Sequence, residues 1–131
     1  MKRFIAIAAL SAGLASPALA TEWISCAAPG GEASFDFLVG SLDILAIAGL
    51  NISVGEKVWA SDVAYGPGEP VAVGQAFEDT NSIRIDAMDG AISAKVAELR
   101  LFKADEGDMF VYGGTLRIPG YGAWAVSCTG P

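Results

Sequence analysis

Short segments in which apolar and polar residues alternate run through the sequence from residue 21 onward, and glycine-bearing turns separate them. A period of two is typical of β-strands, because successive side chains point to opposite faces and one face can be buried. Outside three predicted hairpins, we expect strands at about 22–27, 57–61, 71–77 and 99–104. The sequence therefore predicts a single all-β domain of about eight or nine strands, antiparallel-rich and mostly in meander order, forming a small barrel or a sandwich.

The first predicted hairpin lies in the stretch SFDFLVGSLDILAI, with a two-residue turn at residues 40–41. Glycine in the first turn position suits a type II′ turn, which matches the twist of the strands that flank it. This turn pairs Val39 with Leu42 and Phe37 with Ile44. All of these side chains are apolar and share one face, so the pattern and the turn agree.

The second predicted hairpin lies in IRIDAMDGAISAKV, where Asp-Gly at residues 89–90 is a strong hairpin signal. This turn pairs Ile85 with Ala94 and Ile83 with Val96, again on an apolar face. A helix over residues 91–103 is the competing interpretation, because apolar positions in this stretch also recur at helical spacing. The alternation in ELRLF and the turn favour the strand.

The third predicted hairpin turns at Pro119-Gly120 and sets Thr115 opposite Trp124. Pro-Gly suits a type II turn, which fits two-residue hairpins less well than the primed types, so this register is open to a shift of one residue. In this register Gly113 leaves space that the Trp124 indole covers. The alternative for Gly113 and Gly114 is a ligand that approaches bare backbone.

Residues 1–20 have the features of a cleaved secretory signal peptide: Lys2 and Arg3, an apolar run, and Ala18-Leu19-Ala20 at the end. The remaining 21–131 would form one domain, exported to a periplasmic or extracellular location. Removal of two basic residues changes the net charge from −7 to −9. Such a chain repels phosphate backbones, so we expect no nucleic-acid partner. No later segment is long and apolar enough to predict a membrane span.

Cys26 and Cys128 are the only cysteines, and in an oxidising compartment they are expected to form a disulfide. A loop of about a hundred residues closed in this way stabilises a domain by roughly 4–5 kcal/mol in the chain-entropy model. In an odd-numbered meander the first and last strands run in the same direction. We therefore expect these strands to lie together, as parallel neighbours or joined by a bridge between sheets. Trp124 is expected in the core beside the bridge, whereas Trp23 and Cys26 point to opposite faces.

The sequence contains no histidine, which removes Ser-His and Cys-His nucleophiles and histidine zinc sites. No cofactor motif is present, and no catalytic residue stands out. The acidic turn formed by Asp105, Glu106 and Asp108 is a weak candidate for calcium, because hard cations prefer clustered oxygens. Its spacing matches no calcium loop, so a solvated hairpin tip is the simpler interpretation.

Binding is the preferred functional hypothesis. The irregular segment SDVAYGPGEP presents Tyr65 among turn residues, and Trp59 is the second aromatic candidate. Aromatic rings suit a small apolar or sugar-like ligand, although core packing accounts for most of them. The hypothesis is an exported, disulfide-stapled β domain that binds a protein partner or a small ligand. The alternatives are a carboxylate-dependent hydrolase and a calcium-stabilised envelope or surface component.

Overall fold

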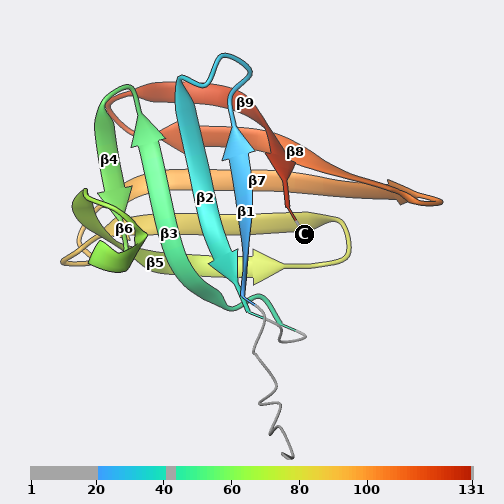
Figure 1. Cartoon of the computed structure of the whole chain (residues 1–131), viewed down its shortest axis with the longest axis horizontal. Coiled ribbons are helices and arrows are strands. Elements are labelled where there is room, and N and C mark those ends of the chain that lie inside the picture. The colour runs from blue at the N-terminus through green and yellow to red at the C-terminus, as the bar shows by residue number, and fades with distance from the viewer. Residues whose placement is uncertain (1–20, 41–43, 131) are drawn as a thin grey trace, which may run out of the picture.

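The computed structural model describes residues 21–40 and 44–130. They form a closed barrel of nine strands, and each strand lies beside the next one in the sequence (Figure 1). The strands are β1 (Glu22–Ala27), β2 (Ala33–Val39), β3 (Ile47–Val54), β4 (Lys57–Ala60), β5 (Glu69–Glu78), β6 (Ser82–Asp89), β7 (Lys95–Glu106), β8 (Met109–Ile118) and β9 (Gly122–Thr129), with a short 3-10 helix η1 (Val63–Tyr65) between β4 and β5. The predicted all-β fold and meander order are confirmed, and the barrel is the alternative that forms.

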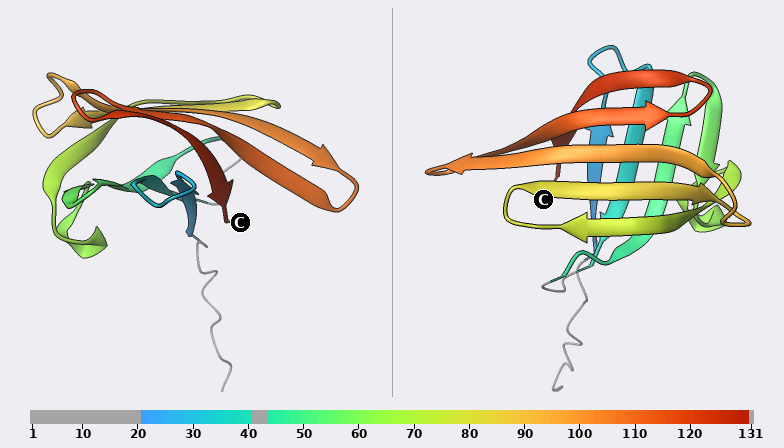
Figure 2. Two further views of the ribbon diagram at one scale, coloured as in Figure 1. Left: turned by 90° about the horizontal axis from the view of Figure 1, so that it is seen from above. Right: turned by 180° about the vertical axis from the view of Figure 1, so that it is seen from behind.

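The barrel is flattened into two layers. Strands β1–β4 form one layer and β5–β9 the other, and the strands of the two layers cross (Figures 1 and 2). Inward-facing side chains from both layers fill the space between them. The largest fully buried ones are Phe35, Phe37, Leu50, Ile52, Ile85, Leu99, Leu101, Leu116 and Ile118. Because side chains occupy this core, a binding site has to be sought on the outer surface.

One junction in the barrel is parallel, and it corrects the predicted strand directions. Strand β5 pairs with β4 in parallel, through Trp59 with Glu69 and Ala60 with Pro70. Residues 61–68 carry the chain back so that β5 starts beside β4 in the same direction. All other neighbours are antiparallel, so β1 and β9 run in opposite directions and the predicted parallel pairing is wrong.

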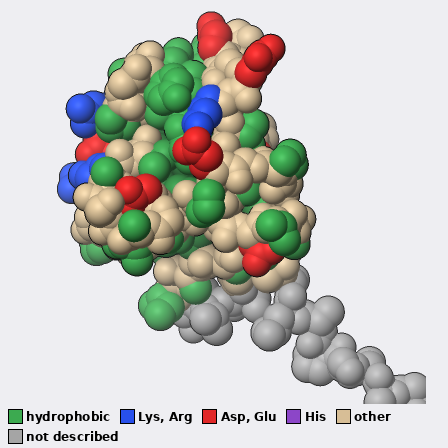
Figure 3. Space-filling model, turned by 90° about the vertical axis from the view of Figure 1, so that its left-hand side faces the viewer, with side chains coloured by type: hydrophobic (Ala, Val, Ile, Leu, Met, Phe, Trp, Pro, Cys, Tyr) green, Lys and Arg blue, Asp and Glu red, His purple; other side chains and the backbone are tan. Residues whose placement is uncertain are grey.

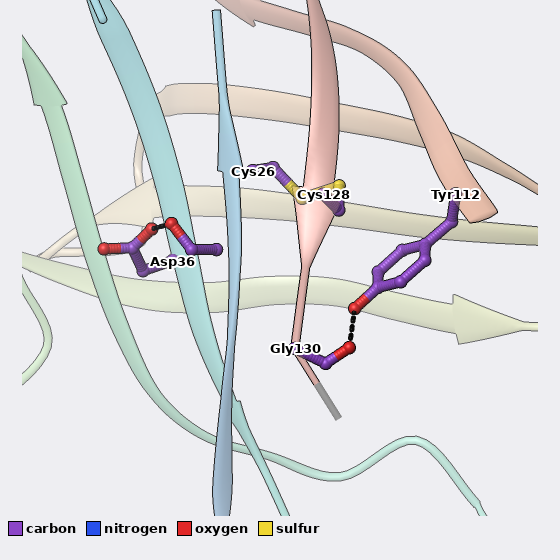
Figure 4. The surroundings of a disulfide bond; sticks show 6 residues. Cys26, Asp36, Tyr112, Cys128 and Gly130 are labelled. Atoms are coloured by element: carbon purple, nitrogen blue, oxygen red, sulfur yellow. Dashed lines mark hydrogen bonds between the residues drawn. A yellow bond between two sulfur atoms is a disulfide. The ribbon is translucent and has the colours of Figure 1, made fainter. Parts of the chain in front are cut away.

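The first and last strands lie together, as predicted, and the Cys26–Cys128 disulfide joins them (Figure 4). The two cysteines face each other directly across the ladder, with Cα atoms 4.0 Å apart. The ladder has three residue pairs, all at the C-terminal ends of the two strands, where β9 bends towards β1. The ladder ends at Ala27, two residues before Pro29, which has no backbone N–H to donate. Trp124 is partly buried and packs against the core.

The first hairpin has a different register from the predicted one. Phe37 pairs with Leu50 and Val39 with Ile47, so the predicted pairing of Phe37 with Ile44 is wrong. The predicted turn at residues 40–41 and Leu42 reach into 41–43, outside the described residues. Both registers place apolar side chains opposite one another, and the observed one pairs all of β2 with β3. The hydrophobic pattern alone cannot separate the two registers.

The second hairpin forms, and residues 95–106 are a strand, so the preferred strand interpretation is confirmed over the helix. Its turn is longer than predicted: Ile85 pairs with Leu99 instead of Ala94. The Asp89 carboxylate explains the longer loop, because it accepts hydrogen bonds from the amide (2.7 Å) and hydroxyl (2.7 Å) of Ser93. These bonds lower the pKa of Asp89 and hold residues 90–94 outside the ladder.

The third hairpin is shifted by one residue. Trp124 pairs with Leu116 instead of the predicted Thr115. The amide of Tyr121 donates a hydrogen bond to the carbonyl of Ile118 at 2.9 Å, which makes the connection three residues long. The type II preference of Pro-Gly is consistent with this extra residue.

Candidate functional site

The loop between β4 and β5 is folded against the outer surface of the barrel. Asp62 caps η1, because its carboxylate accepts a hydrogen bond from the amide of Ala64 at 2.9 Å. The amide of Tyr65 donates to the carbonyl of Asp62, which closes the turn. Glycine and proline at residues 66–68 then end the helix, and the chain enters β5 at Glu69. The turn presents Tyr65 to the neighbouring strand β3.

Tyr65 packs on the outer face of β1–β3. Its ring lies over Gly49, the position of β3 without a side chain. The ring also meets the indole of Trp23 edge-on, with centroids 5.3 Å apart and planes at 79°. Leu38 lies between Trp23 and Gly49 in the ladder rows and is only 6% exposed, although it faces away from the interior. These four residues form a small apolar layer outside the barrel.

A row of polar side chains lies next to this apolar layer. Ser25, Asp36 and Asn51 occupy directly paired positions on β1, β2 and β3. The hydroxyl of Ser25 donates a hydrogen bond to Oδ1 of Asp36 at 2.6 Å (Figure 4). The Nδ2 of Asn51 donates to the carbonyl oxygen of Tyr65 at 2.7 Å and ties the loop to the sheet. Partial burial raises the pKa of Asp36, and the Ser25 hydrogen bond opposes that effect.

These side chains surround an outer-face hollow of about 450 Å³. It is lined by Trp23, Asp36, Asn51, Ala64, Tyr65 and Gly66. A second hollow of about 540 Å³ lies beyond Gly66. The residues that line this second hollow all lie within the segment 60–70. The carboxylate among them, that of Asp62, already accepts the capping hydrogen bond of η1. The outer-face hollow is the better candidate site, because side chains from three strands and the loop converge on it.

The structure gives Trp59 a role in the core. Its side chain is 6% exposed, and its ring meets that of Tyr121 edge-on at 5.5 Å. The ammonium group of Lys57 lies 5.4 Å from the Trp59 ring centroid. Trp59 therefore lies apart from Tyr65 and lines no part of the outer-face hollow.

Gly113 and Gly114 permit close packing between strands. A Cβ on Gly114 would overlap the carbonyl oxygen of Arg100 on β7, and one on Gly113 would lie 2.8 Å from the carbonyl oxygen of Val126 on β9. Neighbouring backbone therefore occupies the space beside both glycines. The predicted cover by Trp124 is absent, because the register brings that indole to Leu116 and next to Gly122.

The described part of the chain contains no group of three or more His, Cys, Asp or Glu side chains that could hold a metal ion, and the acidic turn with Asp105, Glu106 and Asp108 forms no such group. Asp86 is buried, but it forms ion pairs with Arg100 and Lys95 on the layer opposite Asp36. On the face shown in Figure 3, acidic side chains are scattered between uncharged and hydrophobic ones.

The β7–β8 hairpin extends beyond the rest of the barrel (Figures 1 and 2). Phe102, Met109 and Val111 lie on its outer face and are 74%, 70% and 57% exposed. The described residues include nothing that covers them. This apolar surface lies away from the outer-face hollow.

Sequence reasoning identified Tyr65 but missed Trp23, Asp36 and Asn51 as its neighbours. Two signals were present. Asp36 is the polar residue between two inward-facing phenylalanines, which fixes it on the outer face, and Gly49 interrupts a strand, which marks a close approach. Only the observed register of β2 on β3 aligns Asp36 with Asn51.

The part of the chain that the structure describes contains no helix with the length and apolar character needed to span a lipid bilayer. No protein-family model, curated protein or solved structure matches the chain.

Proposed function

We propose that this chain is an exported, disulfide-stapled β domain that acts by binding a ligand in the outer-face hollow. The observation that carries the proposal is the convergence of Trp23, Asp36, Asn51 and Tyr65 from four separate segments on one hollow. Small-molecule sites typically combine apolar walls with a few polar groups that fix orientation. The two aromatic rings and the polar row supply both.

The volume of the hollow also supports this proposal. About 450 Å³ lies within the range of roughly 300–1,000 Å³ that small-molecule sites occupy. The interior of the barrel is filled by side chains, so a ligand carried inside it is disfavoured. The loop that closes one side of the hollow is held by the hydrogen bond from Asn51 to Tyr65, so the site is largely formed before a ligand arrives.

Two observations support export. The first twenty residues have the features of a signal peptide, and a disulfide persists more readily in an oxidising compartment than in the cytosol. Fractionation of cells that produce the full chain, followed by mass spectrometry of the N-terminus, tests this part of the proposal. We expect the protein outside the cytosol with a new N-terminus near Thr21. A cytosolic protein that retains Met1 would contradict export.

Ligand binding is tested by heteronuclear NMR with mixtures of small polar and aromatic compounds. We expect binding compounds to shift the indole signal of Trp23 and the side-chain amide of Asn51, and Trp23→Ala to weaken these shifts. Phe102→Ala is the matched control, because it removes an exposed aromatic ring outside the hollow. Shifts confined to the end of the barrel at Trp59 and Tyr121, or no shifts, would overturn the proposed site.

A further inference from the structure

Asp36 is a partly buried carboxylate with neutral neighbours. Its ladder partners are Ser25 on one side and Asn51 on the other. The six ion pairs found among the described residues do not include it. The titratable groups that line the hollow, within the described chain, are Asp36 and the Tyr65 phenol. No positively charged side chain among the described residues therefore forms an ion pair with this carboxylate.

Two other carboxylates of the described chain, one buried and one half-buried, have positive partners. Asp86 lies 2.8 Å from the guanidinium of Arg100, and Glu98 accepts hydrogen bonds from Lys95 (2.8 Å) and Arg117 (2.9 Å). Burial without a positive partner destabilises a carboxylate anion, and the raised pKa of Asp36 reflects that cost. A positively charged group in the hollow would reduce this cost.

The free side-chain oxygens of Asp36 and Asn51 in the hollow are hydrogen-bond acceptors. Oδ1 of Asp36 accepts from Ser25, while Oδ2 has no hydrogen-bond partner within the described residues. Asn51 uses its amide nitrogen to hold Tyr65, which leaves its Oδ1 as an acceptor. No described buried side-chain oxygen or nitrogen lacks a partner, so both free oxygens reach solvent. This lining is suited to a ligand that donates several hydrogen bonds.

The aromatic walls favour the same ligand chemistry. Trp23 is 39% exposed, and its ring plane stands at 79° to that of Tyr65, so the two rings form a corner. A cation within about 6 Å of an aromatic ring centroid is attracted by the negative face of the ring. The net charge of −7 further attracts cationic ligands.

We infer that the outer-face hollow recognises a cationic nitrogen group, an ammonium or a guanidinium, bound between the Asp36 carboxylate and the rings of Trp23 and Tyr65. This inference rests on the proposed function, because it names the ligand class of the same hollow. A free amine and a lysine or arginine side chain of another protein both carry this chemistry.

The test compares charged probes with neutral ones of the same shape. Butylammonium and methylguanidinium are titrated into the oxidised protein at physiological ionic strength, alongside butanol as the neutral probe of matching shape and glucose as a neutral sugar. A short capped peptide with a central lysine represents a protein side chain. NMR shifts of the Trp23 indole and Asn51 amide give each dissociation constant. We expect the cations to bind at least about tenfold more tightly than butanol.

Asp36→Asn is the decisive variant, because it keeps the shape of the side chain and removes its charge. It is expected to weaken cation binding by at least about tenfold and to leave butanol binding unchanged. Asp105→Asn is the matched control: it removes the same charge from the exposed hairpin tip, and cation affinity should stay at the wild-type value. In the wild-type protein, cation affinity should fall as the pH drops through the raised pKa of Asp36, and Asp36→Asn should lose this dependence.

The outcomes separate this inference from the proposed function. Equal affinities for charged and neutral probes, or an unchanged cation affinity in Asp36→Asn, would overturn the cationic ligand and leave the binding site in place. Failure of every probe and of the compound mixtures to shift Trp23 would overturn both. Tighter binding of the peptide than of butylammonium supports the inference with a protein side chain as the source, and the reverse order supports it with a free amine.

Discussion

The ring of Tyr65 lies directly over Gly49: a Cβ at Gly49 would come within 2.7 Å of Cε2 of that ring. Gly49→Ala should therefore displace Tyr65 and loosen the loop over residues 61–68. We expect faster amide hydrogen exchange in this loop, a changed Trp23 fluorescence, and a loss of about 1–3 kcal/mol in the free energy of unfolding. Gly40→Ala is the control, because no atom of another described residue beyond its chain neighbours lies within 4 Å of its Cβ position. Unchanged exchange in the loop would contradict this packing.

Gly114→Ala should be among the most destabilising single-methyl changes in the barrel. The added Cβ would overlap the carbonyl oxygen of Arg100, which belongs to the backbone of β7 and cannot move without breaking ladder hydrogen bonds. We expect the free energy of unfolding to fall by about 3 kcal/mol or more, measured by urea denaturation. A stability equal to that of Gly40→Ala would show that the two strands lie farther apart than in this structure.

The Cys26–Cys128 bridge should contribute a large part of the stability of the domain, because it spans a sequence separation of 102 residues and supports a ladder of three pairs. Replacement of both cysteines by alanine is expected to lower the free energy of unfolding by about 2–5 kcal/mol. Reduction of the disulfide in the wild-type protein should lower the urea midpoint to about that of the double-alanine variant. A midpoint that is the same with and without the bridge would rule out this role.

The ion pairs of Glu98 predict a loss of stability in acid. Hydrogen bonds from Lys95 and Arg117 lower its pKa from 4.5 to about 2. Because the folded-state pKa is lower, the contribution of Glu98 is complete above about pH 4.5 and is lost as the pH falls towards 2. We expect a contribution of about 0.5–1 kcal/mol, as for exposed ion pairs. The free energy of unfolding should fall less between neutral pH and pH 3 in Glu98→Gln than in the wild-type protein. In Glu106→Gln it should fall as much as in the wild-type protein.

Tyr112 fastens the end of the described chain. Its phenol donates a hydrogen bond to the carbonyl oxygen of Gly130 at 2.6 Å (Figure 4). Tyr112→Phe should lower the free energy of unfolding by about 0.5–1.5 kcal/mol and speed hydrogen exchange in the last residues of β9. Tyr121→Phe is a suitable comparison, since its ring is half exposed. Equal exchange in both variants would argue against the hydrogen bond.

Strand positions followed from the sequence because alternation is a local property. Strand β1 has the predicted bounds, and β5 and β7 extend the predicted segments by a few residues. Strand register was harder to predict, because it depends on loop length. The Asp89 carboxylate stabilises a loop of five residues in place of the expected two-residue turn. The pattern of apolar and polar residues does not show this side-chain contact.

The candidate site was only partly predictable for a related reason. Tyr65 stood out because it lies among turn residues, where a ring has no obvious strand to pack on. Asp36 and Asn51 lie 15 positions apart in the sequence and become neighbours only through the β2–β3 register. The direction of β9 was predicted wrongly because it depends on the parallel junction between β4 and β5. The residues of SDVAYGPGEP alone do not indicate that this loop returns the chain parallel to β4.

The pairing of the first strand with the last has a kinetic consequence. A ribosome makes β1 first and β9 last, so the closing ladder forms only after almost the whole chain has been synthesised. Contacts so distant in sequence slow folding, because loop-closure entropy is lost before they form. During this delay one edge of β1 stays unpaired and can join a strand of another molecule. Loss of the last few residues of β9 would therefore leave the newly made chain open to aggregation.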